Sequence, residues 1–236
     1  MHRFFADSAD ICGDKLIISG DEAKHIKNVL RMQQGDEFVA FDGTGIDYTC
    51  RITEVGTVVK ASITLRVPNM SEPDVSVTLY QAYPKAAKME EIVQKAVELG
   101  VTMIVPFLSL RCVKRPDDVS RLRRVALSAV KQCGRSVLPH VSDVLGFESA
   151  LMRMQNHDKL IVCWEEEREM PLKTALDGNA RDIGVVIGSE GGFSLEEVER
   201  MREVGGVSAT LGPRILRTET AGIAVIASVM YDKGQM

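Results

Sequence analysis

Two glycine-bearing turns near the C-terminus hold the side chains most able to do chemistry. The first, Gly188-Ser-Glu-Gly-Gly-Phe-Ser194, follows the apolar run 183–187. The second, residues 211–222, reads Leu-Gly-Pro-Arg-Ile-Leu-Arg-Thr-Glu-Thr-Ala-Gly and follows the run 207–211. Glycine lets the backbone approach a ligand closely and adopt positive φ. Each run is typical of a buried strand, so we expect the turns to end neighbouring parallel strands and to line one crevice.

The residues inside these turns narrow the class of ligand. Neither turn has the dinucleotide spacing G-x-G-x-x-G or the phosphate-loop ending G-K-[ST], and the Glu190 carboxylate would repel a phosphate. A neutral or zwitterionic cofactor fits the first turn better. This turn also has a structural explanation, because Ser194 and Glu197 have the spacing of a capping box. In the second turn, Thr218 or Thr220 is expected to cap the last helix.

The charge of the chain is uneven along its length. The 236 residues have a net charge of −4, which gives no overall sign of a nucleic-acid partner. Between residues 111 and 135, however, eight basic residues are opposed by two acidic ones, a local charge of +6. A polyanion responds to this local potential. The pattern fits a solvated helix face equally well, and charge alone leaves both interpretations open.

Cysteine content and hydropathy bear on the compartment. The five cysteines are odd in number and form no C-x-x-C pair, which favours reduced thiols over disulfides or a zinc site. No apolar run approaches the roughly 20 residues of a membrane span. The first residues lack the apolar stretch of a signal peptide. We therefore expect a cytoplasmic protein with no membrane partner and no metal.

The apolar pattern changes at residues 68–74, a linker candidate that contains two prolines. Before it, alternating runs predict a small β-barrel interrupted by one helix, with strands at 37–41, 48–54 and 58–67 and the helix at 20–32. After it, strands and helices alternate, which predicts an α/β domain with a largely parallel sheet. Its first elements are expected as strands at 75–82, 101–107 and 160–164 and helices at 88–99 and 117–133. Lys88 lies on the polar side of its helix, where local ion pairing explains such residues.

Segments along nearly the whole chain carry a family resemblance. They are Arg3-Phe-Phe5, His25-Ile-Lys-Asn-Val-Leu-Arg31, Gln94-Lys-Ala-Val-Glu-Leu-Gly100, Arg111, Gln132-Cys-Gly-Arg135, Ile187-Gly-Ser-Glu-Gly-Gly-Phe193 and Leu211-Gly-Pro-Arg-Ile-Leu-Arg-Thr-Glu-Thr-Ala221. On these motifs, of which the last two are the most specific, the chain resembles the bacterial 16S ribosomal RNA uracil-N3 methyltransferases of the SPOUT class. One position departs from the pattern. Family members usually have proline where Ser189 stands, which should alter the stiffness of the turn more than its chemistry.

The resemblance implies a fold, a cofactor and partners. It implies a PUA-like RNA-binding β-barrel over residues 1–70 and a methyltransferase domain over 71–236, whose parallel sheet contains a deep trefoil knot. It also implies a homodimer and a substrate uridine in the decoding centre of 16S rRNA, within the small ribosomal subunit. The implied cofactor is S-adenosylmethionine, held by the backbone of both turns. Its predicted binding residues are Ile187, Gly188, Glu190, Gly191, Gly192, Leu211, Gly212, Ile215 and Leu216.

Methylation at uracil N3 requires loss of a proton and stabilisation of the charge that develops on O2 and O4. We assign the stabilisation to Arg217, with Glu219 a weaker candidate base. The predicted RNA-binding residues are Arg3, Lys24, Lys27, Arg31, Arg111, Lys114, Arg115, Arg121, Arg123, Arg124 and Arg135. Two alternatives remain: methylation of another RNA position or of a ribose 2′-hydroxyl, and an RNA-binding assembly factor without catalysis.

Overall fold

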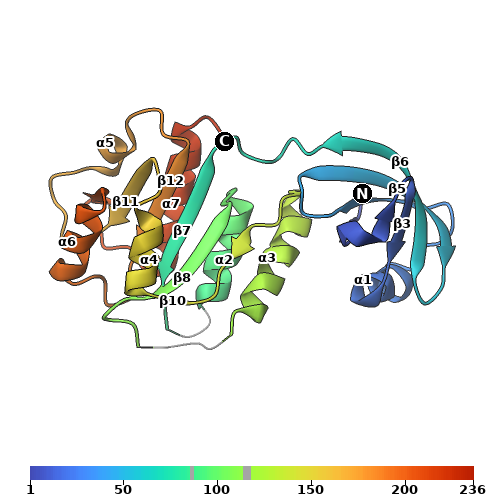
Figure 1. Ribbon diagram of the computed structural model, residues 1–236, viewed down its shortest axis with the longest axis horizontal. Helices are drawn as coiled ribbons and strands as arrows, with labels where there is room; N and C mark the ends of the chain where they lie inside the picture. Colours follow the sequence, from blue (N-terminus) through green and yellow to red (C-terminus); the bar gives the residue numbers. More distant parts are fainter. Residues whose placement is uncertain (86–87, 114–117) are drawn as a thin grey trace. The chain divides into compact units, whose positions relative to one another are not determined.

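The computed structural model describes residues 1–85, 88–113 and 118–236 (Figure 1). They form two compact units: unit 1 comprises Met1–Glu72 and Val130–Leu138, and unit 2 comprises Pro73–Ala129 and Pro139–Met236. The division into functional domains at residue 70 remains a proposal. None of the described helices is long and apolar enough to cross a bilayer.

Unit 1 is built on a six-stranded mixed sheet. Its order is β1-β4-β5-β6-β3-β2, with β1 parallel to β4 and the other pairs antiparallel. The expected barrel is therefore an open half-barrel, and the three strands predicted between residues 37 and 67 are confirmed. The elements are β1 Arg3–Phe5, η1 Ser8–Asp10, β2 Ile11–Cys12, β3 Lys15–Ile18, α1 Gly20–Lys24, η2 His25–Val29, β4 Glu37–Phe41, β5 Ile46–Val55 and β6 Val59–Pro68.

The helix predicted over residues 20–32 is shorter and changes its hydrogen-bond register. After α1, the π-helical turn η2 begins, and Leu30 N–H donates to the carbonyl of His25 at 3.0 Å. Arg31 then adopts φ +54°, a left-handed conformation that is uncommon for residues other than glycine. Ala23 and Ile26 nevertheless stay buried in the core of unit 1. The wider turn thus keeps both apolar side chains in this core, and the left-handed conformation of Arg31 follows it.

A partly buried ion-pair network holds Val130–Leu138 within unit 1. Arg135, only 2% exposed, donates from Nε and Nη2 to Oε2 of Glu72 at 3.0 and 2.8 Å. The other Glu72 oxygen accepts the N–H groups of Ser136 and Val137. Glu72, placed by the sequence in a linker, therefore stabilises this unit. Arg135 is buried against it, so we assign Arg135 a structural role in place of the predicted RNA contact.

Arg3 takes part in the same network. Its guanidinium donates to both carboxylate oxygens of Asp47, at 2.7 and 3.1 Å, and to the hydroxyl of Ser136 at 2.6 Å. Burial raises the pKa of Asp47, but hydrogen bonds from Arg3, Ser136 and Asn69 outweigh it, and the pKa lies below its ordinary value. The side chain of Arg3 is only 16% exposed. Its role in the structure described here is to tie β1 to β5, and the predicted RNA contact would require it to leave Asp47.

The described residues of unit 2 contain a parallel sheet of seven strands, which confirms the predicted parallel sheet. The order is β10-β8-β7-β12-β11-β13, with β9 beside β8. The strands are β7 Ser76–Ala82, β8 Met103–Leu108, β9 His140–Val141, β10 Leu145–Gly146, β11 Lys159–Cys163, β12 Asp182–Ile187 and β13 Gly206–Ala209. The helices are α2 Lys88–Glu98, α3 Ser120–Cys133, α4 Phe147–Met154, α5 Leu172–Leu176, α6 Leu195–Glu203 and α7 Thr218–Asp232. The trefoil knot remains a prediction, because strand order does not define how the chain threads.

Helices cover the sheet of unit 2, and its central strands β7 and β12 are therefore buried along nearly their whole length. Helices α4 and α6 share one core cluster with residues of β7, β8, β11 and β12. Helix α2 packs against α7, which contacts β7 and β12. The buried residues of α2 follow the spacing i, i+3, i+4, i+7, i+8 that defines an apolar helix face: Met89, Ile92, Val93, Ala96 and Val97.

Substitution of Glu72 by Gln should destabilise unit 1 strongly. The buried guanidinium of Arg135 would lose the negative charge of Glu72, and breaking a buried ion pair typically costs about 3–5 kcal/mol. The control is Glu37→Gln, because Glu37 and Arg51 form an exposed pair of the kind that contributes about 0–1 kcal/mol. Urea denaturation of both variants measures the difference, and equal free energies of unfolding would contradict the role given to Glu72.

Candidate functional site

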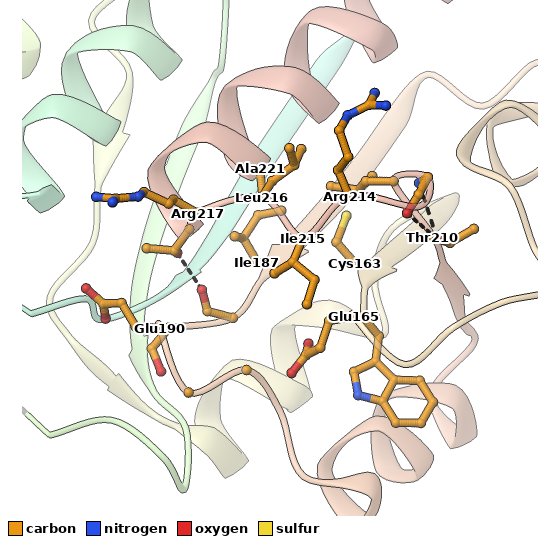
Figure 2. Close-up of a pocket in the computed structure, with 18 of the residues that line it drawn as sticks. Cys163, Glu165, Ile187, Glu190, Thr210, Arg214, Ile215, Leu216, Arg217 and Ala221 are labelled. Atoms are coloured by element: carbon orange, nitrogen blue, oxygen red, sulfur yellow. Dashed lines mark hydrogen bonds between the residues drawn. The ribbon is translucent and has the colours of Figure 1, made fainter.

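A pocket of about 1040 Å³ lies in unit 2, at the carboxyl ends of β11 and β12 and along the chain that joins β13 to α7. All nine residues predicted to bind a cofactor line it, together with Arg217. Figure 2 shows Arg217 and Glu190 toward one side of the pocket and Glu165 and Thr210 toward the other. The structure thus brings the two glycine turns together. Glu219 does not line the pocket, but it contacts Lys88, and Lys88 does line the pocket.

The two turns do not end neighbouring strands, contrary to the expectation from the sequence. Strand β11 lies between β12 and β13 and is parallel to both. The carboxyl end of β11 therefore adds a third wall to the pocket. Four of the lining residues that the sequence analysis did not assign to the site come from this segment: Cys163, Trp164, Glu165 and Arg168. The others are Lys88 of α2 and, in or beside the two turns, Ser189, Thr210, Pro213, Arg214, Thr218 and Ala221.

The first turn closes tightly on itself. The N–H of Gly192 donates to the carbonyl of Ser189 at 3.0 Å, and Gly192 has φ +64°. A methyl group on Gly188 would lie 3.1 Å from the Cα of Gly192, closer than ordinary contact. Two of the glycines are thus required by the backbone itself. Helix α6 then begins with the predicted capping box between Ser194 and Glu197, which is confirmed.

Buried hydrogen bonds connect this turn to β7 and to the start of α7. The amide nitrogen of Gln81 donates to the hydroxyl of Thr218 at 2.9 Å, and this hydroxyl donates to the carbonyl of Gly188 at 2.5 Å. Arg217 occupies the N-cap position of α7 without a side-chain cap. The prediction that Thr218 or Thr220 caps the helix is therefore wrong. The Thr218 hydroxyl instead donates to Gly188 in the first glycine turn, and this bond holds the two glycine turns of the pocket together.

One ammonium group lies between two carboxylates beside the pocket. Nζ of Lys88 is 3.0 Å from Oε1 of Glu190 and 3.2 Å from Oε2 of Glu219. The second contact is an ion pair without an aligned hydrogen bond, since Oε2 has no hydrogen-bond partner among the described residues. The backbone N–H of Lys85 also donates to Glu190. Lys88 was read from the sequence as a surface residue, and only the tertiary structure reveals its partners.

The pKa values of these groups follow from their contacts. Burial raises the pKa of Glu190, but hydrogen bonds from Lys88 and Lys85 outweigh it and leave the pKa below normal. Burial likewise raises the pKa of Glu219. This effect is outweighed by three others, from its own backbone N–H, Lys88 and Arg217, so the pKa lies below its ordinary value. The contacts with the two carboxylates raise the pKa of Lys88. All three groups are therefore charged at neutral pH, which makes Glu219 a poor proton acceptor.

The loop after β11 is held by a second polar network. Glu167 accepts hydrogen bonds from the Ser208 hydroxyl at 2.5 Å and from Arg202 at 3.1 Å. Bonds from Ser208 and from backbone N–H groups lower the pKa of Glu167 to about 2. The guanidinium of Arg202 lies 5.5 Å from the ring centre of Trp164, which lines the pocket. The network thus fixes the wall formed by Trp164 and Glu165.

The basic residues predicted to bind RNA have different environments. In unit 2, Arg121, Arg123 and Arg124 are exposed on α3, where Arg121 pairs with Glu90 and Arg123 with Asp143. Arg111 donates to the carbonyl of Gly191 at 2.8 Å and so contacts the first turn. In unit 1 the exposed members are Lys24, Lys27 and Arg31. Lys114 and Arg115 lie outside the described residues.

Comparisons with known proteins place this architecture. The chain matches sequence models of an RNA methyltransferase domain over residues 71–230 and of an RNA methyltransferase PUA domain over residues 18–57. It is 34% identical over 228 residues to the ribosomal RNA small subunit methyltransferase E of Bacillus subtilis, covering 91% of this chain and 89% of that protein. Among solved structures, the Neisseria gonorrhoeae protein of the same name, bound to S-adenosylmethionine, matches with a TM-score of 0.84 at 32% identity, covering 98% of this chain and 97% of that chain. A Legionella pneumophila protein in complex with the same cofactor matches with a TM-score of 0.86 at 28% identity, covering 97% and 96%.

Two glycine-to-alanine substitutions, one in the first turn and one in α7, should change stability in opposite directions. Gly192→Ala forces φ +64° on alanine and places its methyl group 1.8 Å from Oε1 of Glu165, so we expect a loss of about 1–2 kcal/mol. Gly222→Ala, inside α7, puts a methyl group at an ordinary 3.7 Å from Gln81 and should stabilise by about 0.5–1 kcal/mol. Urea denaturation of the two variants tests this pair. A stabilising Gly192→Ala substitution would contradict the described turn.

Proposed function

The chain belongs to the RNA methyltransferase family that includes the ribosomal RNA small subunit methyltransferases E, and from this premise we propose that it methylates N3 of a uridine in 16S ribosomal RNA. The methyl donor is S-adenosylmethionine, and the product is 3-methyluridine. The observation that supports the proposal best is the convergence of both glycine turns and Arg217 on one pocket. The resemblance of the sequence motifs to uracil-N3 enzymes supports the choice of base and atom.

The residues of the pocket fit this cofactor. Its volume of about 1040 Å³ admits a nucleoside with an amino-acid tail, and Gly188, Gly191 and Gly212 leave backbone exposed to it. The hydroxyl of Ser189 and the indole N–H of Trp164 are buried at the pocket without hydrogen-bond partners among the described residues. Such groups are normally satisfied, so both are available to a ligand. Glu165 and Glu190 suit a cofactor whose net charge is positive.

In the proposed mechanism the chain positions the reactants and stabilises charge. When bound, S-adenosylmethionine supplies an electrophilic methyl group on a positively charged sulfur. Arg217, exposed at the start of α7, stabilises the negative charge that develops on uracil O2 and O4 as N3 loses its proton to solvent water. The lowered pKa of Glu219 favours this role of Arg217 over base catalysis by Glu219.

Methyl transfer to small ribosomal subunits that lack the modification tests the proposal. The assay uses labelled S-adenosylmethionine, followed by mass spectrometry of the nucleosides. We expect labelled 3-methyluridine. A 2′-O-methyl nucleoside would assign the chain to another reaction of the same class, and cofactor binding without transfer to any ribosomal RNA would favour the assembly factor.

Loss of the Arg217 side chain should slow chemistry with little effect on cofactor binding. In Arg217→Ala we expect the single-turnover rate to fall by about 10²–10³, as for other groups that stabilise developing negative charge. The dissociation constant for S-adenosylmethionine, measured by calorimetry, should stay within about threefold, because the turns that form the pocket are unchanged. Arg181→Ala serves as a control, since Arg181 pairs with Asp74 at an exposed position. A normal rate in Arg217→Ala would refute the assignment.

The exposed arginines of α3 are proposed to bind the phosphate backbone of the RNA. Charge reversal of Arg121 and Arg124 should weaken binding to the small subunit and reduce the slope of log affinity against log salt by about one per lost phosphate contact. The double variant Lys173→Glu/Arg181→Glu changes the net charge equally at exposed positions elsewhere in unit 2. Equal salt slopes in the two double variants would remove α3 from the RNA surface.

A homodimer is also part of the proposal, on the strength of the family resemblance. Ile215 and Tyr231 are 86% and 78% exposed, large apolar side chains that a second copy would shield. Sedimentation equilibrium decides between one and two copies. A monomer at micromolar concentration would exclude this part of the proposal.

A further inference from the structure

Lys88 connects three elements that are distant in the sequence. It is the first residue of α2, and its ammonium contacts Glu190 in the turn after β12 and Glu219 in the first turn of α7. The side chains of Lys88, Glu190 and Glu219 are only 27%, 27% and 15% exposed, so the contacts are partly shielded from solvent. A solvated helix face does not explain this arrangement.

The other lysine of α2 provides a contrast. Lys95 pairs with Glu98, one turn later on its own helix, at 2.9 Å. This is the local pairing that stabilises an isolated helix. Lys88 has no such local ion pair among the described residues, and both of its carboxylates come from the two turns of the pocket.

Arg217 is the cation two residues before Glu219 in the chain, and it forms no ion pair among the described residues. Its charge nevertheless lowers the pKa of Glu219, so the two groups are within electrostatic reach. Without Lys88, Arg217 would be the other cation whose charge acts on the ionised carboxylate of Glu219. A guanidinium forms two parallel hydrogen bonds with a carboxylate and is held firmly when it does.

We infer that Lys88 is a positioning residue that occupies Glu219 and Glu190 and thereby leaves the guanidinium of Arg217 free for the substrate. This inference rests on the proposed function of Arg217. It assigns to Lys88 no contact with the reacting atoms. Lys88 acts by neutralising the carboxylate that would otherwise compete with the uracil for Arg217.

If the inference is correct, a second substitution, at Glu219, should restore the rate that is lost when Lys88 is replaced. Lys88→Met should lower the single-turnover rate of methyl transfer about tenfold or more, and Lys88→Arg should stay within about threefold of the unmodified protein. In Lys88→Met/Glu219→Gln the competing charge is absent, so the rate should return to that of Glu219→Gln alone. A merely structural role of Lys88 predicts no such rescue. Lys95→Met is the matched control on the same helix and should leave the rate unchanged.

A second readout does not depend on catalysis. Phenylglyoxal modifies free guanidinium groups, and peptide mass spectrometry reports the modification of Arg217 in the full chain. We expect its rate to fall about threefold or more in Lys88→Met and to recover in the double variant with Glu219→Gln. Failure of the unmodified protein to methylate RNA, with this pattern present, would refute the proposed function but not the role of Lys88.

Three results would overturn the inference. The first is a Lys88→Met variant with normal transfer and normal Arg217 reactivity. The second is a Lys88→Met/Glu219→Gln variant as slow as Lys88→Met while Glu219→Gln is active. The third is an inactive Glu219→Gln variant, because the carboxylate would then be needed for the chemistry itself. Calorimetric binding of S-adenosylmethionine by each variant establishes that the pocket is intact.

Discussion

The hydrogen bond from the Thr218 hydroxyl to the carbonyl of Gly188 is the contact on which the site depends. The two glycine turns follow strands that are separated by β11, so sheet pairing does not join them directly. Thr218 begins α7, and its hydroxyl also accepts the amide of Gln81 at the end of β7. The side chains of Gln81 and Thr218 are buried, where an unmade hydrogen bond is costly. The start of the last helix is therefore held against the first turn, and the pocket lies between them.

The charged groups near this hydrogen bond are of two kinds, those paired within the protein and one that is left exposed. Lys88 lies between the carboxylates of Glu190 and Glu219, whose pKa values are lowered, while Arg217 on the same turn of α7 is exposed. Cationic and anionic groups a few residues apart in the chain thus have different tasks. In the proposed mechanism, the carboxylates that Lys88 neutralises hold the pocket together, and the free guanidinium of Arg217 is available to the substrate.

The arginines show that residue type alone does not tell whether a side chain stabilises the fold or is free to bind RNA. Arg3 and Arg135 belong to motifs that suggest an RNA surface, yet they bond to Asp47 and Glu72 within unit 1. Arg121 is 71% exposed on α3. A guanidinium suits a buried carboxylate and a phosphate equally well, because both offer two oxygens in a plane. Only the position of the acid, which lies far away in the sequence, distinguishes the two uses.

The sequence by itself determined the parallel sheet of unit 2, the alternation of its helices, the capping box at Ser194 and the two turns, because glycine spacing, apolar periodicity and caps act over a few residues. The family motifs also brought together the residues that line the pocket. Tertiary structure alone decided that β11 lies between the turns, that Thr218 bonds Gly188 and does not cap its helix, and that Lys88 lies between two acids. These features depend on contacts between segments distant in the chain, and no local pattern specifies which distant partner a polar side chain will meet.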